Sequence, residues 1–222
     1  MQHEIEILGD ADAVARRGAA LVAERARAAA ADHGRFSFAV SGGKTPWAMF
    51  AYLVVEDVPW EYVTIFQVDE RIAPDGDPDR NLTHLRESLG AAPASVRPMP
   101  VGDGDIESAA ARYGATLPER LDLIHLGLGD DGHTASLVPG DPVLDVINRP
   151  VALTQEYRGR RRMTLTYPAL ARADQLLWLV TGADKVGPLG KLRAGDRSVP
   201  AGRVEAARSL IVADRAAAGG AT

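Results

Sequence analysis

The hydrophobic residues of this chain gather into short apolar runs that alternate with longer amphipathic segments. The runs are rich in Val, Ile, Leu and Phe and are bounded by Gly, Pro and Asp. That pattern is typical of buried β-strands, and the polar/apolar alternation of the first run favours an edge strand. We predict strands at residues 4–8, 36–40, 63–68, 96–101, 121–126, 151–154, 163–166, 176–181 and 210–212.

The amphipathic segments between these runs predict helices. Asp10 or Asp12 is expected to cap the first helix, which ends near Gly34. Pro46 suits the first turn of the second helix, and Asn81 is expected to cap the third. The second and third helices are expected at 47–54 and 82–89, and further helices at 105–117 and from Lys185 to about Leu192. Strands that alternate with helices predict an α/β fold, with a mostly parallel sheet covered by helices on both faces.

Length and composition narrow the protein class. A chain of 222 residues suits one large α/β domain spanning 1–222. The net charge of −5 argues against a broad nucleic-acid-binding face, and the lack of cysteine excludes disulfides, thiolate catalysis and Cys-ligated zinc. We recognise no secretory signal and no apolar run of the roughly 20 residues that a membrane span needs, so a cytoplasmic protein is expected.

A glycine-rich loop with two aspartates and a histidine follows the strand at 121–126. Open α/β sheets bind their ligands at the carboxyl ends of strands, and glycines let the backbone turn sharply there. His133 is the best candidate for a general base, because the unperturbed pKa of histidine, about 6.5, suits proton transfer near neutral pH. Asp131, two residues earlier, is placed to orient it.

The other histidines and the serines lack such a setting. His3 is terminal, His33 lies near the end of a helix, His84 is inside a helix, and His125 is in a buried strand. Ser41 and Ser136 lie in motifs, but neither has the G-x-S-x-G elbow of a serine nucleophile. No H-E-x-x-H spacing occurs, so we predict no metal site.

A turn of small residues links the strand at 36–40 to the helix at 47–54. Backbone N–H groups at a helix N-terminus bind anions, and Lys44 adds a positive charge within the turn. The GxxxxGK[ST] spacing of a P-loop is absent, and an ordinary tight turn is an equal alternative for this stretch alone. The candidate phosphate-binding residues of the turn are Ser41, Gly42, Gly43, Lys44 and Thr45.

Arg71 and Lys185 also follow predicted strands. Asp69 and Glu70 precede Arg71 and would orient its guanidinium to bind a phosphate or carboxylate through two hydrogen bonds. Taken singly, a surface ion pair at Arg71 and an exposed lysine at Lys185 are the more ordinary interpretations. The turns share one arrangement of strand, polar turn, basic residue and helix. Because parallel strands end at one edge of a sheet, we expect Lys44, Arg71 and Lys185 to converge.

Five sequence blocks, in this order, resemble the glucosamine-6-phosphate isomerase/6-phosphogluconolactonase family. The blocks are 41–46, 68–71, 127–137, 162–166 and 180–185. The resemblance covers nearly the whole chain and implies a Rossmann-like α/β fold of the NagB/RpiA-like kind. It implies hydrolysis of 6-phospho-D-glucono-1,5-lactone to 6-phosphogluconate without a cofactor. The loop 158–162 is a further candidate for a phosphate contact, with the choice of arginine open.

Joined with the resemblance, the residues suggest a mechanism. The turn at 41–45, Arg71 and Lys185 would hold the phosphate and the developing negative charge. His133, supported by Asp131, would take a proton from water, which attacks the lactone carbonyl, and would return it to the departing ring oxygen. The expected partner is a small sugar phosphate, with no nucleic acid and no membrane, and the expected assembly is a monomer or small homo-oligomer.

Two alternatives remain. The deaminating isomerase branch of the family typically carries a carboxylate where this chain has Val138, and an aromatic or aliphatic residue where it has Arg71. Both differences favour the lactonase branch. A non-catalytic sugar-phosphate sensor would usually add a DNA-binding helix-turn-helix, and the first helix here has no partner helix for one.

Overall fold

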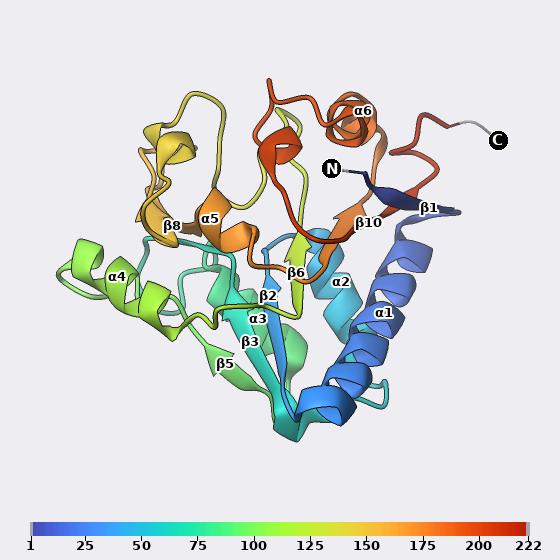
Figure 1. Cartoon of the computed structure of the whole chain (residues 1–222), viewed down its shortest axis with the longest axis horizontal. Coiled ribbons are helices and arrows are strands. Elements are labelled where there is room, and N and C mark those ends of the chain that lie inside the picture. The colour runs from blue at the N-terminus through green and yellow to red at the C-terminus, as the bar shows by residue number, and fades with distance from the viewer. Residues whose placement is uncertain (1, 221–222) are drawn as a thin grey trace.

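The architecture is organised by a fully parallel sheet, which confirms the predicted α/β class (Figure 1). The structure is a computed structural model that describes residues 2–220. Seven strands within that range form the sheet. In spatial order they are β1 (Glu4–Leu8), β10 (Ser209–Asp214), β9 (Leu176–Val180), β6 (Leu123–Leu126), β2 (Phe36–Val40), β3 (Val63–Gln67) and β5 (Ser95–Arg97).

Helices connect these strands, and the sequence pattern predicts all of them except the short helix at Tyr167–Leu170. They are α1 (Ala11–His33), α2 (Lys44–Leu53), α3 (Asn81–Leu89), α4 (Ile106–Thr116), α5 (Tyr167–Leu170) and α6 (Val186–Ala194), with short 3-10 turns at Trp60–Tyr62, Pro142–Asp145, Ala183–Lys185 and Ala201–Arg203. Asp10 caps α1, because its carboxylate accepts the N–H of Ala13 at 2.8 Å. Gly34 ends α1 with a φ of 70°. No helix in residues 2–220 is long and apolar enough to cross a membrane.

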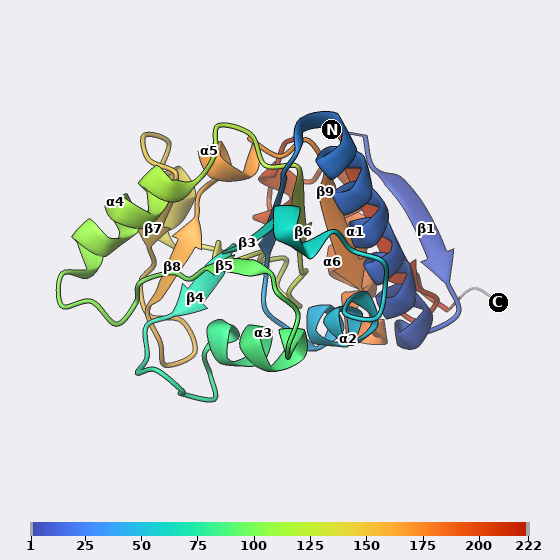
Figure 2. The same ribbon diagram turned by 90° about the horizontal axis from the view of Figure 1, so that it is seen from below.

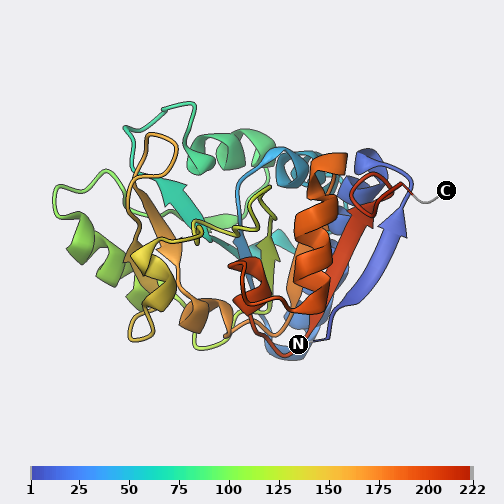
Figure 3. The same cartoon turned by 90° about the horizontal axis from the view of Figure 1, so that it is seen from above.

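Both faces of the sheet are covered. Viewed from below, α1 lies across one face (Figure 2), and viewed from above, α6 lies across the other (Figure 3). Neighbouring residues of one strand therefore enter different cores: Leu177 packs with Phe38 and Phe50 on the α1 side, while Trp178 packs with Ile124 on the other. Burial on both faces explains why the central strands are continuous apolar runs rather than alternating ones.

A second, antiparallel sheet stands beside the first. It consists of β4 (Asp69–Arg71), β8 (Arg162–Leu165) and β7 (Val151–Leu153), with β8 in the middle. Asp69-Glu70-Arg71 is expected directly after the strand at 63–68, and the structure shows that this polar triplet is a separate strand that pairs with β8. The chain leaves the main sheet at Val68, whose carbonyl accepts the N–H of Leu165 at 2.8 Å.

The end of one strand and the cap of one helix are among the predictions that differ from the structure. The strand expected at 96–101 covers only Ser95–Arg97, because two prolines follow that cannot donate to a strand ladder. Met99 between them donates its N–H to the side-chain oxygen of Gln67 instead, at 2.8 Å. Asn81 is the first residue of α3 and does not cap it with its side chain.

The carboxylate of Glu70 takes over that capping role. It is fully buried and accepts the N–H groups of Asn81 and Leu82, each at 2.8 Å. The side chain of Arg80, also buried, lies 3.1 Å from the same carboxylate. A side chain from the second sheet thus fixes the start of α3 beside the carboxyl ends of the main strands.

The chain order places a crevice at the middle of the main sheet. From β2 the chain continues to β3 on one side, whereas from β6 its next strand of the sheet, β9, lies on the other side. Between β2 and β6 the strand order reverses. Open α/β sheets hold their ligands at such a switch point, outside the carboxyl ends of the strands.

Candidate active site

A cleft of about 640 Å³ opens at this switch point. Its walls come from the segments that follow β2, β3, β6 and β9, with Asn81 and two arginines of the loop 158–162, so distant parts of the sequence meet there. The cleft brings together Ser41, Gly42, Gly43, Lys44, Thr45, Arg71, His133 and Lys185, all of which the sequence singles out. Asp131 lies behind His133, outside the lining. The predicted convergence of Lys44, Arg71 and Lys185 on one cleft is confirmed.

His133 and Asp131 form a hydrogen-bonded pair. The Nδ1 atom of His133 lies 2.5 Å from Oδ1 of Asp131, which also accepts the backbone N–H of His133 at 2.9 Å. Gly129 makes room for this arrangement, because a Cβ there would lie 2.0 Å from the same Nδ1 atom. The imidazole is 19% exposed, so it reaches the cleft while most of its surface is packed.

The charge of Asp131 suits an orienting role. Burial alone would raise its pKa, but hydrogen bonds from the backbone and ring of His133 outweigh burial and hold the pKa of Asp131 below its usual range. The carboxylate is therefore ionised at neutral pH and accepts the proton of Nδ1. In a neutral imidazole, this leaves the lone pair on Nε2 of His133 free to take a proton.

Another part of the cleft lining is the N-terminus of α2. Gly43 occupies the N-cap of α2 with a φ of 139° and gives no side-chain cap, so the first N–H groups of α2 are free for an anion. The hydroxyl of Ser41 is buried and has no hydrogen-bond partner within residues 2–220. Thr45 contacts Thr181 through their hydroxyls at 3.0 Å, which ties this turn to the end of β9.

Arg71 is held differently from the prediction. Its guanidinium donates to the side-chain oxygen of Asn81 and to the carbonyl of Asp79, each at 2.7 Å. The carboxylate of Glu70 does not contact this guanidinium; from Arg71 it accepts only the backbone N–H, at 2.8 Å. Asn81 also approaches Gly42 so closely that a Cβ there would lie 1.9 Å from its Oδ1 atom. The amide of Asn81, which sequence analysis took for a helix cap, therefore positions Arg71.

Lys185 reaches the cleft from the turn after β9. Gly182 adopts a φ of 101°, and its N–H donates to both carboxylate oxygens of Asp214 at 3.1 Å. That contact joins the turn to the end of β10. The ammonium of Lys185 lies 2.6 Å from Asp184 and remains 20% exposed.

The structure selects among the arginines of the loop 158–162. Arg160 pairs with Asp77 and Asp79, and Arg161 turns back to a backbone carbonyl. Arg158 and Arg162 line the cleft.

Arg162 is buried, and its Nε atom has no partner among the described residues. Burial lowers its pKa, and the nearby carboxylate of Asp69 works in the opposite direction. The guanidinium still stays charged at neutral pH. The sequence alone does not show which of the four arginines in this loop reaches the cleft. The register of β8, which begins at Arg162, decides this.

Two residues that the sequence sets aside have structural roles. His125 on β6 is fully buried, with no partner for either ring nitrogen within the described range, and burial lowers its pKa to about 3. It is a neutral core residue. Ser136 is also buried and donates its hydroxyl to Asp69 at 2.7 Å, so it is not placed as a nucleophile.

Asp130, Asp131 and His133 stand close enough to be considered as metal ligands, because their ligand atoms lie within 4.8 Å of one another. Both carboxylates already have partners in the protein. Asp130 pairs with Arg158 at 3.2 Å, and the second oxygen of Asp131 accepts the hydroxyl of Tyr157 at 3.1 Å. We therefore assign no metal to this group.

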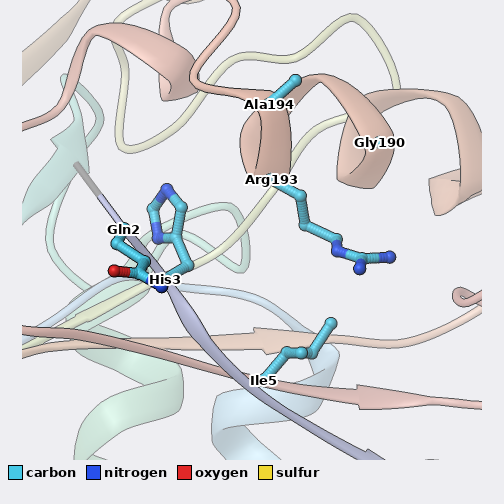
Figure 4. Close-up of a pocket in the computed structure, with 6 residues that line it drawn as sticks. All are labelled: Gln2, His3, Ile5, Gly190, Arg193 and Ala194. Atoms are coloured by element: carbon cyan, nitrogen blue, oxygen red, sulfur yellow. The ribbon is translucent and has the colours of Figure 1, made fainter.

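A second hollow, of about 590 Å³, lies between β1 and α6, away from these residues (Figure 4). His3 and Arg193 line it, and the figure shows their side chains extending in different directions. The Nδ1 atom of His3 is hydrogen-bonded to the hydroxyl of Ser209 at 2.7 Å. This hollow has no acid–base pair facing an anion site, so the cleft at the switch point is the candidate active site.

The parallel sheet and its switch-point cleft make this a Rossmann-like α/β protein, and the cleft holds a hydrogen-bonded Asp–His pair together with several basic side chains. Residues 9–212 match the family described as glucosamine-6-phosphate isomerases/6-phosphogluconolactonase, and the chain belongs to that family.

Two curated relatives agree with this assignment. The chain is 34% identical over 208 residues to a 6-phosphogluconolactonase of Synechocystis sp., covering 87% of this chain and 86% of the relative. It is also 34% identical over 211 residues to a 6-phosphogluconolactonase of Rhizobium meliloti, covering 89% and 91%. Both relatives are named 6-phosphogluconolactonase, and the match covers most of each of them.

Solved structures share the fold. The 6-phosphogluconolactonase of Trypanosoma brucei superposes with a TM-score of 0.87 at 23% identity, covering 100% of this chain and 99% of that one. A monomeric glucosamine-6-phosphate deaminase superposes almost as well, with a TM-score of 0.84 at 16% identity, covering 97% and 98%. The fold alone therefore does not choose between the two branches.

Proposed function

We propose that this protein hydrolyses 6-phospho-D-glucono-1,5-lactone to 6-phospho-D-gluconate, the second step of the oxidative pentose phosphate pathway. The observation that carries the proposal is the pair of Asp131 and His133, which faces an uncapped helix N-terminus across one cleft. Hydrolysis of a phosphorylated lactone needs both parts: an anion site that binds the phosphate and a base that takes a proton from water. The 34% identical relatives that bear the lactonase name support the same substrate.

The phosphate is held by the turn 41–45 and by the basic residues around it. Hydrogen bonds come from the N–H groups at the start of α2 and from the hydroxyl of Ser41, which is buried and has no partner among residues 2–220. Lys185, Arg71 and Arg162 supply positive charge to the phosphate, and the two arginines also supply it to the oxyanion that forms during the reaction.

His133 performs the proton transfers. Its Nε2 atom takes a proton from water, and the water oxygen attacks the lactone carbonyl to form a tetrahedral oxyanion. When the oxyanion collapses, the bond from the carbonyl carbon to the ring oxygen breaks, and His133 gives its proton to that oxygen. Asp131 stays ionised and stabilises the transient imidazolium. One water molecule is consumed and an acid with a free hydroxyl is formed.

Val138 supports the lactonase over the deaminase branch. A deaminating isomerase must move protons between neighbouring carbons, and the typical carboxylate for that work stands where this chain has Val138. The side chain of Val138 is only 4% exposed and apolar. Lactone hydrolysis needs one base that returns the proton it took, which His133 supplies alone.

A coupled assay tests the proposed function. The lactone is generated freshly from glucose 6-phosphate, and 6-phosphogluconate formation is measured after correction for spontaneous hydrolysis, beside an assay for ammonia release from glucosamine 6-phosphate. We expect enzyme-dependent lactone hydrolysis and no ammonia. Activity on the amino sugar alone would overturn the proposal in favour of the deaminase, and phosphate-dependent binding without turnover would favour a sensor.

Replacing Lys185 with Ala is expected to raise KM for the lactone by about 10- to 100-fold, because a hydrogen bond to a charged group contributes about 1.5–3 kcal/mol. The effect on kcat should be smaller, since the phosphate is bound in both the ground state and the transition state. Steady-state kinetics check this, with the exposed Lys191 replaced by Ala as the control. An unchanged KM for Lys185→Ala would remove it from the phosphate site.

A further inference from the structure

We infer that Tyr157 is a positioning residue for Asp131 and His133, an inference that rests on the proposed function of that pair. Tyr157 lies outside the glycine-rich loop, in the basic hairpin that follows β7, and nothing in the sequence pattern points to it. Two separate contacts connect it to the pair, one through its hydroxyl and one through its ring.

The hydroxyl anchors the far side of the carboxylate. Oδ1 of Asp131 faces His133, while Oδ2 accepts the hydroxyl of Tyr157 at 3.1 Å. The carboxylate is 35% exposed, and the terminal torsion of an aspartate has broad, weakly separated minima. A hydrogen bond at each oxygen fixes the carboxylate plane, and with it the direction in which Nε2 of His133 points.

The ring restrains the imidazole directly. The two ring centroids are 5.7 Å apart with an interplanar angle of 66°, an edge-to-face contact that aromatic pairs favour. Because the imidazole is held by Asp131 at Nδ1 and by Tyr157 at its side, rotation about its side-chain torsions is restricted. A base held in one orientation meets its water in a reactive geometry more often.

Tyr157 is itself held by a tight hairpin. Tyr157 and Arg160 exchange backbone hydrogen bonds at 3.0 and 3.3 Å, and the two residues between them have φ of 51° at Arg158 and 78° at Gly159. Two left-handed residues in succession are the signature of a type I′ turn, which suits a two-residue hairpin. The guanidinium carbons of Arg158 and Arg162 each lie 5.1 Å from the ring centroid of Tyr157.

Two further features agree with a donor role. Burial raises the pKa of Tyr157, and its hydrogen bond to the ionised Asp131 raises it further, so the hydroxyl keeps its proton. Arg158 also ties the hairpin to the loop by pairing with Asp130 at 3.2 Å, but both side chains of that pair are about 60% exposed. An ion pair in that setting contributes little, which leaves Tyr157 as the main link.

The test is Tyr157→Phe, which keeps the ring and removes only the hydroxyl. We expect kcat for lactone hydrolysis to fall about tenfold, as for loss of a charge-assisted hydrogen bond, with KM and the thermal melting temperature unchanged. Tyr62→Phe, at an exposed tyrosine away from the cleft, is the matched control and should keep the wild-type kcat.

A double-mutant cycle separates positioning from direct contact with substrate. If Tyr157 acts through Asp131, then Tyr157→Phe should cause no further loss in an Asp131→Asn background. A loss that persists in that background, a raised KM at constant kcat, or a wild-type kcat for Tyr157→Phe would each overturn the inference. If the proposed function itself is wrong, the result differs, because the wild-type protein will not hydrolyse the lactone. Loss of activity in His133→Gln verifies that the measured hydrolysis depends on the pair of Asp131 and His133.

Discussion

Replacing His133 with Gln is expected to lower kcat for lactone hydrolysis by about 10³-fold. A positioned general base contributes typically 10²- to 10⁴-fold, and this residue acts twice in the proposed reaction, first on water and then on the ring oxygen. Gln is polar and of similar length and can still donate to Asp131, so the loop should keep its shape. What it lacks is a basic nitrogen at the position of Nε2.

Binding distinguishes loss of chemistry from loss of structure. His133→Gln should bind the product 6-phosphogluconate with nearly wild-type affinity, because the turn 41–45 and Lys185 are untouched, and its melting temperature should change little. His33→Gln is the matched control. His33 is the last residue of α1 and pairs with Asp122, just before β6, so its replacement should leave kcat unchanged. A kcat within tenfold of wild type for His133→Gln would exclude it as the base.

The parts of the site that follow from sequence are those fixed by local geometry. Asp131 and His133 are two residues apart in a glycine-rich loop, and their contact is made within that loop. Lys44 and Lys185 each follow an apolar run, and the parallel order of the strands brings their turns to one edge. Periodicity and strand-end rules are sufficient to predict both arrangements.

The parts that sequence does not predict depend on pairing between distant strands. Arg162 faces the cleft because β8 pairs with β4 in a register that sets Arg71 opposite Arg162, and no local signal encodes that register. Tyr157 reaches Asp131 only because the hairpin after β7 folds back over the loop. Asn81 is of a residue type that commonly caps helices, but the buried carboxylate of Glu70, from another element, caps α3 instead.

Glu70 shows most clearly why local patterns fail here. In the sequence it lies in a charged triplet typical of the surface, yet its carboxylate is fully buried. It accepts four hydrogen bonds at 2.8–2.9 Å, from the N–H groups of Arg71, Asn81 and Leu82 and from the side chain of Gln67, and it pairs with Arg80. A buried charge is tolerated only when such donors converge on it, and they come from two segments of the chain.

Glu70→Gln is accordingly expected to lower the free energy of unfolding by about 3–5 kcal/mol, the usual cost of removing one partner of a buried ion pair. The amide would turn an NH₂ group toward donors, leave the buried Arg80 with only the exposed Asp75 as an anionic partner, and weaken the cap of α3. For a chain of this size, about 2–4 °C per kcal/mol gives a fall in melting temperature of about 6–20 °C.

Differential scanning calorimetry measures this change, with Glu87→Gln on the exposed side of α3 as the control, expected within about 0.5 kcal/mol of wild type. Below its lowered melting temperature, Glu70→Gln should also bind the lactone more weakly, because Glu70 positions the backbone of both Arg71 and Asn81. A melting temperature within 2 °C of wild type would mean that water satisfies these donors. In that case the second sheet, rather than Glu70, would hold Arg71 at the cleft.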